Sequence, residues 1–159
     1  MSKNYLLIPF FFALIIIGLG LSGIGSVVPE MTKQFGVTSA VMGRVFLFHG
    51  LGYFISIMIA GFLGDIMQKS FLLRLGLLIS ALGFVGISSF HGFTQVILSF
   101  MAMGIGLGFV DCMVNPILTE IFTKNPGAIL NIVHAFYGLG SLSAPRLYAF
   151  LSQRQYNWQ

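Results

Sequence analysis

The chain has 159 residues, of which 57% are hydrophobic and 8% are charged, and its formal net charge is +4. Soluble domains carry charge on about 25% of their residues, so this composition excludes an ordinary soluble enzyme and a disordered segment. A disulfide scaffold is excluded as well, because the chain contains a single cysteine, Cys112. With a mean hydropathy of +0.95, the chain is expected to fold in lipid.

The basic residues give no sign of a nucleic-acid partner. The Lys and Arg side chains are scattered along the whole chain instead of forming a patch. Such spacing is typical of membrane proteins, in which Lys and Arg at the ends of spans reach the lipid headgroups. The basic residues are Lys3, Lys33, Arg44, Lys69, Arg74, Lys124, Arg146 and Arg154.

Charge-free stretches can be compared with a bilayer, whose hydrocarbon core takes about 20 helical residues. The stretch 75–110 is too long for one span and contains a turn signal at residues 91–93, so it predicts two helices. We therefore expect an all-α, polytopic transmembrane bundle with five spans at residues 5–28, 39–63, 71–90, 94–119 and 127–151. Short polar connections are expected at residues 29–33, 64–70, 91–93 and 120–126.

The first expected helix is interpreted as a retained span and not as a cleaved signal peptide, because its apolar run is too long and no A-x-A site follows. Residues 18–23 match G-x-G-x-x-G, but no strand precedes them, so a dinucleotide site is not expected. Gly18, Ser22 and Gly25 fall on one stripe of the helix. Small residues let transmembrane backbones approach closely, so this stripe predicts a helix-packing face.

Polar stripes mark the second and fifth expected helices. His49, Tyr53 and Ser56 are spaced at i, i+4 and i+7 on the second helix. Asn131 and His134 share a stripe of the fifth helix. Together with the fourth helix, these stripes predict a hydrated cavity within the bundle.

The fourth expected helix carries Asp111, eight residues before Thr119 and thus about 12 Å along the axis from the end of the span. A carboxylate inside the hydrocarbon is costly, so Asp111 predicts a proton or substrate site. Asn115 lies on the same face, one turn further along. The alternative interpretation is that Asp111 lies near a helix end and merely reaches water or Arg74.

No enzyme, metal or cofactor is expected. An intramembrane aspartyl protease needs two carboxylates at one site, and Asp111 is the only acidic residue deep within an expected span. The residues His49, His91, His134 and Cys112 lack the spacing of metal ligands. No recognised motif for a serine nucleophile is present either.

Residues 61–69, at the end of the second expected helix, read G-F-L-G-D-I-M-Q-K. Gly61, Leu63, Asp65 and Lys69 match the loop motif G-x-L-x-D-R-x-G-R-K, and the whole chain resembles the first five helices of a major facilitator superfamily transporter. The resemblance implies a cytoplasmic N-terminus and a cytoplasmic loop motif at Gly61, Asp65 and Lys69. It also implies an architecture of twelve helices in two halves. Residues 156–159 resemble the loop that precedes the sixth helix of this architecture.

Residues 106–116 and 130–136 are most similar to the fucose:proton symporter branch and related sugar carriers. This resemblance implies that Asp111 takes part in proton coupling and that His134 faces the sugar cavity. Gly25 stands where that branch has a second acidic residue. Helical phase and resemblance together predict a cavity lined by Asn115, Asn131, His134, His49 and Tyr53.

The sequence therefore predicts the N-terminal part of a secondary carrier in the cell membrane. Its substrate is expected to be a small polar solute, a sugar, coupled to protons. Expected partners are the lipid bilayer, the solute and protons, and either the remaining C-terminal helices or a second copy of the chain. The alternative is a non-transporting, truncated membrane subunit or scaffold.

Overall fold

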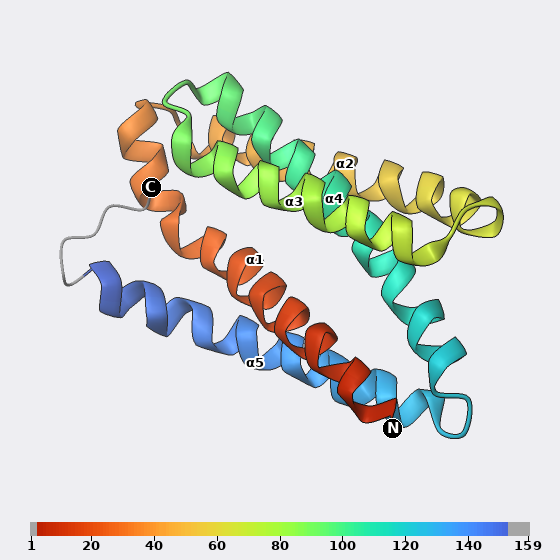
Figure 1. Cartoon of the computed structure of the whole chain (residues 1–159). Helices are drawn as coiled ribbons and strands as arrows, with labels where there is room; N and C mark the ends of the chain where they lie inside the picture. The colour runs from red at the N-terminus through yellow and green to blue at the C-terminus, as the bar shows by residue number, and fades with distance from the viewer. Residues whose placement is uncertain (1–2, 153–159) are drawn as a thin grey trace. The chain divides into compact units, whose positions relative to one another are not determined.

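The computed structural model describes residues 3–152, so Arg154 and the expected loop at residues 156–159 lie outside the described residues. Within this range, five helices are long and apolar enough to cross a membrane, judged by length and composition. The prediction of an all-helical chain with five spans is confirmed (Figure 1). After a short 3-10 turn at Lys3–Leu6, the helices are α1 (Leu7–Phe35), α2 (Ser39–Ile66), α3 (Lys69–Ser89), α4 (Phe93–Ile121) and α5 (Pro126–Ser152).

Helix α1 is longer than the sequence predicts, because it continues through Pro29 to Phe35 instead of ending at Val28. The expected connection at residues 29–33 is therefore wrong. The helix ends at Gly36, whose positive φ of 60° suits a residue without a side chain. The N–H of Gly36 donates to the carbonyl of Lys33, and the next N–H bonds five residues back, which is the hydrogen-bond pattern of a Schellman cap.

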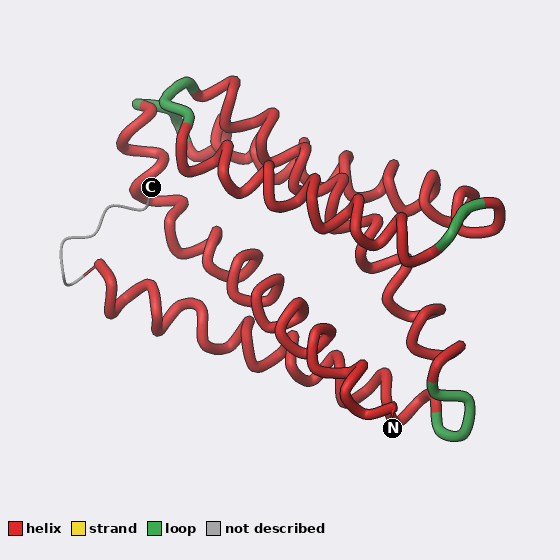
Figure 2. Tube along the Cα trace, viewed as in Figure 1, coloured by secondary structure: helices red, strands yellow, loops and turns green. Residues whose placement is uncertain are grey.

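The connections after α2 and α4 are shorter than expected, whereas the one after α3 keeps its three residues, at 90–92. Figure 2 shows the loops between the long helices. Helix α2 continues to Ile66, so only Met67 and Gln68 separate it from α3. Helix α4 begins after Gly92, whose N–H is capped by the side chain of Gln95 at 3.3 Å. The helix then runs past residue 120 to Ile121, so the connection expected at 120–126 begins two residues later.

The chain divides into two compact units. The α1–α5 unit comprises α1 up to Met31, the end of α4 from Leu118, and α5. The α2–α4 unit comprises Thr32–Ile117, which includes α2, α3 and most of α4. Each unit is built around close helix contacts at glycine residues.

In the α1–α5 unit, α1 and α5 run parallel (Figure 1). The contacts show this, because the residue numbers increase in the same direction along both helices. A Cβ on Gly18 or Gly140 would overlap a backbone carbonyl of the facing helix, so only glycine permits this approach. Gly25 departs from the expected packing face, because an added Cβ there meets no described atom within 4 Å. The contacts are Phe11–Phe136, Ile15–Gly140, Gly18–Tyr137 and Ser22–Ser141.

In the α2–α4 unit, α4 contacts both α2 and α3 through glycines. A Cβ on Gly52 of α2 would lie 2.5 Å from the carbonyl oxygen of Met101, and one on Gly76 of α3 would lie 2.7 Å from that of Gly106. The numbering of the contacts shows that α4 runs parallel to α2 and antiparallel to α3. Because α4 has neighbours on two sides, 67% of its most apolar stretch is buried, against 22% for α2.

The two parallel pairs are built from repeated sequence. Residues 48–52 read F-H-G-L-G and residues 136–140 read F-Y-G-L-G, while residues 18–21 and 104–107 read G-L-G-L and G-I-G-L. The repeated glycines make equivalent contacts: Gly104 meets the carbonyl of His49 as Gly18 meets that of Tyr137. Helix α1 thus corresponds to α4, and α2 corresponds to α5.

Candidate functional site

The α2–α4 unit brings together two residues that the sequence places on separate polar stripes. The hydroxyl of Tyr53 on α2 donates a hydrogen bond to Oδ2 of Asp111 on α4, with 2.5 Å between the two oxygens. Asp111 is exposed and Tyr53 is half-buried within the described residues. The alternative partner Arg74 donates instead from Nε to the carbonyl of Ser70 at 3.1 Å.

Glycine packing holds the two backbones at the level of this pair. A Cβ on Gly108 would lie 2.7 Å from the carbonyl oxygen of Tyr53 and would also overlap the hydroxyl of Ser56. Ser56 is buried, and its hydroxyl donates to the Tyr53 carbonyl at 2.9 Å. This serine belongs to the predicted polar stripe, but its hydroxyl is used within its own helix.

His49 lies one turn before Tyr53 on α2. Its Nε2 atom is buried and has no hydrogen-bond partner among the described residues. A buried polar atom without a partner costs about 1–3 kcal/mol, so the unpaired Nε2 of His49 is an unfavourable feature of the α2–α4 unit as described. Asn115, one turn beyond Asp111, is half-buried and makes a polar or electrostatic interaction.

The remaining predicted cavity residues belong to the other unit. Asn131 and His134 both lie on α5 and are exposed. Among the six predicted coupling and cavity residues, Tyr53 and Asp111 are joined by a hydrogen bond. Two residues of the loop motif differ from their expected setting in the connection 64–70, because Asp65 lies in the last turn of α2 and Lys69 begins α3. Gly61 lies on α2, as expected.

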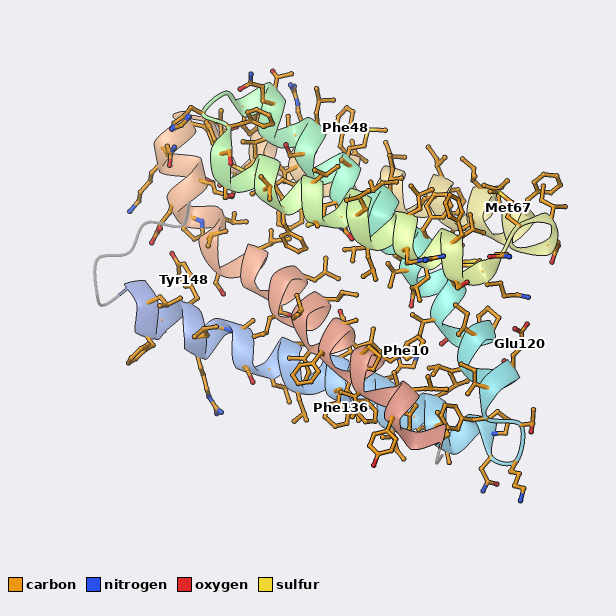
Figure 3. All side chains as sticks on the ribbon, in the orientation of Figure 1. Phe10, Phe48, Met67, Glu120, Phe136 and Tyr148 are labelled. Carbon is orange, nitrogen blue, oxygen red and sulfur yellow. The ribbon has the colours of Figure 1, made fainter. Side chains whose placement is uncertain are left out.

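Sequence reasoning missed Glu30, which was assigned to a connection because it follows Pro29. The structure places Glu30 inside α1, and its carboxylate lies next to the buried hydroxyl of Tyr148 on α5. Figure 3 labels Tyr148. The assignment of Glu30 to a connection is therefore wrong. The signal that could have placed Glu30 correctly is Gly36 followed by Thr38, which is a helix stop followed by an N-cap.

The site offers a carboxylate that can bind a proton and neutral groups that can donate or accept hydrogen bonds. Within residues 3–152, no group of three or more His, Cys, Asp or Glu side chains could hold a metal ion. The single thiol, Cys112, lies beside Asp111, and its Sγ is 3.9 Å from the carbonyl oxygen of Ile57. The arrangement therefore favours proton binding and hydrogen-bond recognition.

Comparison with known proteins gives one family and a set of distant relatives. The model of the Major Facilitator Superfamily matches residues 10–159. Protein TsgA of Escherichia coli O9:H4 (strain HS) and Protein TsgA of Shigella flexneri are each 23% identical to the chain over 135 residues. The match covers 84% of this chain and 34% of each relative, so the chain spans about a third of the length of these curated relatives.

Proposed function

Because the chain belongs to the major facilitator superfamily, a family of membrane transporters, we propose that it forms the first five helices of a secondary carrier. The carrier moves a small polar solute, a sugar, together with protons across the cell membrane. Alternating access requires two halves that rock about a central site. The working protein therefore includes further helices or a second copy of this chain.

The hydrogen bond between Tyr53 and Asp111 is the observation that carries this proposal. A charged residue in a membrane helix is costly, and such residues commonly mark proton or substrate pathways. In the proposed mechanism, Asp111 binds a proton when the solute binds, and the loaded site then opens to the other side of the membrane. The proton and the solute are released there, and the empty carrier returns to its first orientation.

The chemistry of the cavity residues supports a hydroxylated solute over an ionic one. Apart from Asp111, the proposed lining consists of amide, imidazole and phenol groups, which donate and accept hydrogen bonds without fixed charge. A sugar hydroxyl both donates and accepts, so it fits such groups. The proposed lining residues are Asn115, Asn131, His134, His49 and Tyr53.

The proposed orientation has the N-terminus in the cytoplasm. With that orientation, the short connection after α2 faces the cytoplasm, and Asp65 and Lys69 lie at this end of α2 and α3. We assign them to a cytoplasmic latch between helices. Gly61, one turn before Asp65, belongs to the same motif.

The test is accumulation of radiolabelled sugars by cells that express the longest reading frame containing this chain. Asp111→Asn keeps the shape of the side chain but removes the proton-binding group, so accumulation should fall to the level of passive equilibration. Glu120→Gln, at the exposed end of α4, is the matched control and should accumulate normally. Normal accumulation by the Asp111→Asn carrier would refute the coupling role. Correct insertion without any uptake by the unmodified protein would favour the scaffold.

A further inference from the structure

We propose that Tyr53 is the positioning residue for coupling: its hydroxyl holds the Asp111 carboxylate until the solute takes the place of the phenol. This inference rests on the proposed function, in which Asp111 binds the transported proton. Tyr53 donates to Oδ2 of Asp111 across 2.5 Å. A hydrogen bond to a carboxylate is about twice as strong as one between neutral groups, so the phenol competes with the solute for this side chain.

Release of the carboxylate does not require the helices to separate. Gly108 brings α4 against the backbone of α2 beside the pair, and Ser56 bonds to the Tyr53 carbonyl at 2.9 Å. These contacts fix the backbone at Tyr53, whereas its side chain is half-buried and Asp111 is exposed. Rotation of the phenol about its own side-chain bonds is therefore sufficient to free Asp111.

The internal repeat argues that the pair is not needed to hold two parallel helices together. In the α1–α5 unit, the positions that correspond to Tyr53 and Asp111 are Ser141 and Gly25. There the helices are joined at Ser22 and Ser141, and Gly25 faces open space. The same helix packing thus forms without a phenol or a carboxylate at this level, so a role in packing does not explain the Tyr53–Asp111 pair.

Other polar groups near the pair come from each helix of the α2–α4 unit. On α2, His49 lies one turn before Tyr53, and its Nε2 is buried without a described partner. On α4, Cys112 follows Asp111 directly and points to a carbonyl of α2. On α3, Arg74 is bonded to a carbonyl of its own helix. Among these described groups, Tyr53 is the one that donates to the carboxylate.

The coupling step conserves every proton. A proton from the aqueous phase binds to the Asp111 carboxylate and forms the neutral acid, while Tyr53 keeps its own hydroxyl proton throughout. A hydroxyl of the solute then replaces the phenol as the partner of Asp111. Because one donor replaces another, the carboxyl group keeps a hydrogen-bond partner throughout the exchange.

The experiment compares Tyr53→Phe, Asp111→Asn and Tyr5→Phe in the complete carrier, with two readouts. Net accumulation requires proton coupling, whereas exchange of labelled for unlabelled solute requires only binding and movement of the site. Tyr53→Phe removes one hydroxyl and should lower accumulation about tenfold or more while exchange continues. Tyr5 is 70% exposed, so its variant is the matched control and should behave as the unmodified carrier.

The outcomes separate this inference from the proposed function. Accumulation lost in Asp111→Asn but unchanged in Tyr53→Phe would overturn the role of Tyr53 and leave the proposed function intact. Loss of both readouts in Tyr53→Phe would also overturn it, because the phenol would then be needed for transport as a whole, through solute binding or folding, and not for coupling in particular. Normal accumulation in Asp111→Asn would refute the proposed function itself.

A second measurement needs no transport. Infrared spectra of this chain in liposomes contain the carboxyl bands of Asp111, which are identified by their loss in Asp111→Asn. Removal of the phenol in Tyr53→Phe should shift these bands, since the carboxyl group loses its hydrogen-bond donor. Unshifted bands would overturn the pairing of Tyr53 with Asp111 in the membrane.

Discussion

The α1–α5 unit and the α2–α4 unit each contain a pair of parallel helices with equivalent glycine contacts, but the polar side chains between the two helices differ. Both pairs meet at glycines, as at Gly18 in one unit and Gly104 in the other. At the next turn, however, one unit has a contact between two serines and the other has a phenol bonded to a carboxylate. The comparison indicates that glycines determine the packing, while a few polar positions determine the chemistry.

The units differ in burial as well. The most apolar stretch of α4 is 67% buried because α2 and α3 cover it, whereas the corresponding stretch of α1 is 22% buried. Helix α4 also packs against α3, through Gly76 and Gly83. Among the described residues, the α1–α5 unit has no helix that corresponds to α3. The uncovered apolar surface of α1 is thus suited to lipid or to a further helix.

The largest effect is expected where the shared packing is broken. In Gly108→Val, the new side chain would overlap Ser56 and press against the Tyr53 carbonyl, so α2 and α4 must separate. Overpacking of this kind costs about 3 kcal/mol of unfolding free energy. Thermal unfolding in detergent, followed by circular dichroism, measures the loss. Gly61→Val is the control, since its Cβ meets nothing within 4 Å; equal stability of the two variants would contradict the packing role.

A smaller energy, the coupling between a phenol and a carboxylate, is expected when the polar pair is moved between the units. Gly25→Asp alone introduces a membrane carboxylate, which costs about 2.5–3.5 kcal/mol on insertion scales. Adding Ser141→Tyr supplies the phenol from the corresponding position, so the double variant should recover about 1 kcal/mol. A double-mutant cycle of unfolding free energies measures this coupling. Strictly additive effects would show that the repeat does not reproduce the geometry of the Tyr53–Asp111 pair.

The smallest effect is expected at the serine contact. Ser141→Ala removes the hydroxyl that meets Ser22 but leaves the glycine contacts of α1 and α5 in place. Interhelical hydrogen bonds in membranes contribute about 0.6 kcal/mol on average, so the unfolding free energy should fall by about that amount. Ser143→Ala, whose hydroxyl bonds within its own helix, serves as the comparison. If Ser141→Ala lost more unfolding free energy than Gly108→Val, polar contacts would contribute more to stability than glycine packing, contrary to this prediction.

The five spans were predictable from the sequence because charge-free lengths near those of a bilayer are a strong signal. The end of α1 was not predictable, because the local signals compete. Pro29 and Glu30 indicate that the helix ends near residue 28, whereas Gly36 indicates that it ends seven residues later. Cooperative hydrogen bonding of a long apolar helix outweighs the N–H that proline lacks, an interior loss of about 3 kcal/mol. Glu30 was misplaced for this reason.

The candidate site was predictable in part. Helical phase puts His49 and Tyr53 on one face of α2, and Asp111 on a polar face of α4, but phase does not determine which level of one helix meets which level of another. That register comes from the glycine contacts, which join positions far apart in the sequence. The bond between Tyr53 and Asp111 therefore emerges only from the three-dimensional packing.

The parallel pairing of α1 with α5 has a consequence for the biogenesis of the protein. Ser22 and Ser141 are separated by 119 residues, so α1 leaves the ribosome long before its partner exists. At synthesis rates of about 5–20 residues per second, the delay is on the order of ten seconds. During that interval α1 sits in the translocon or in lipid with its glycine surface uncovered. Helices α2, α3 and α4 are completed earlier, so they are free to assemble while α1 still waits for α5.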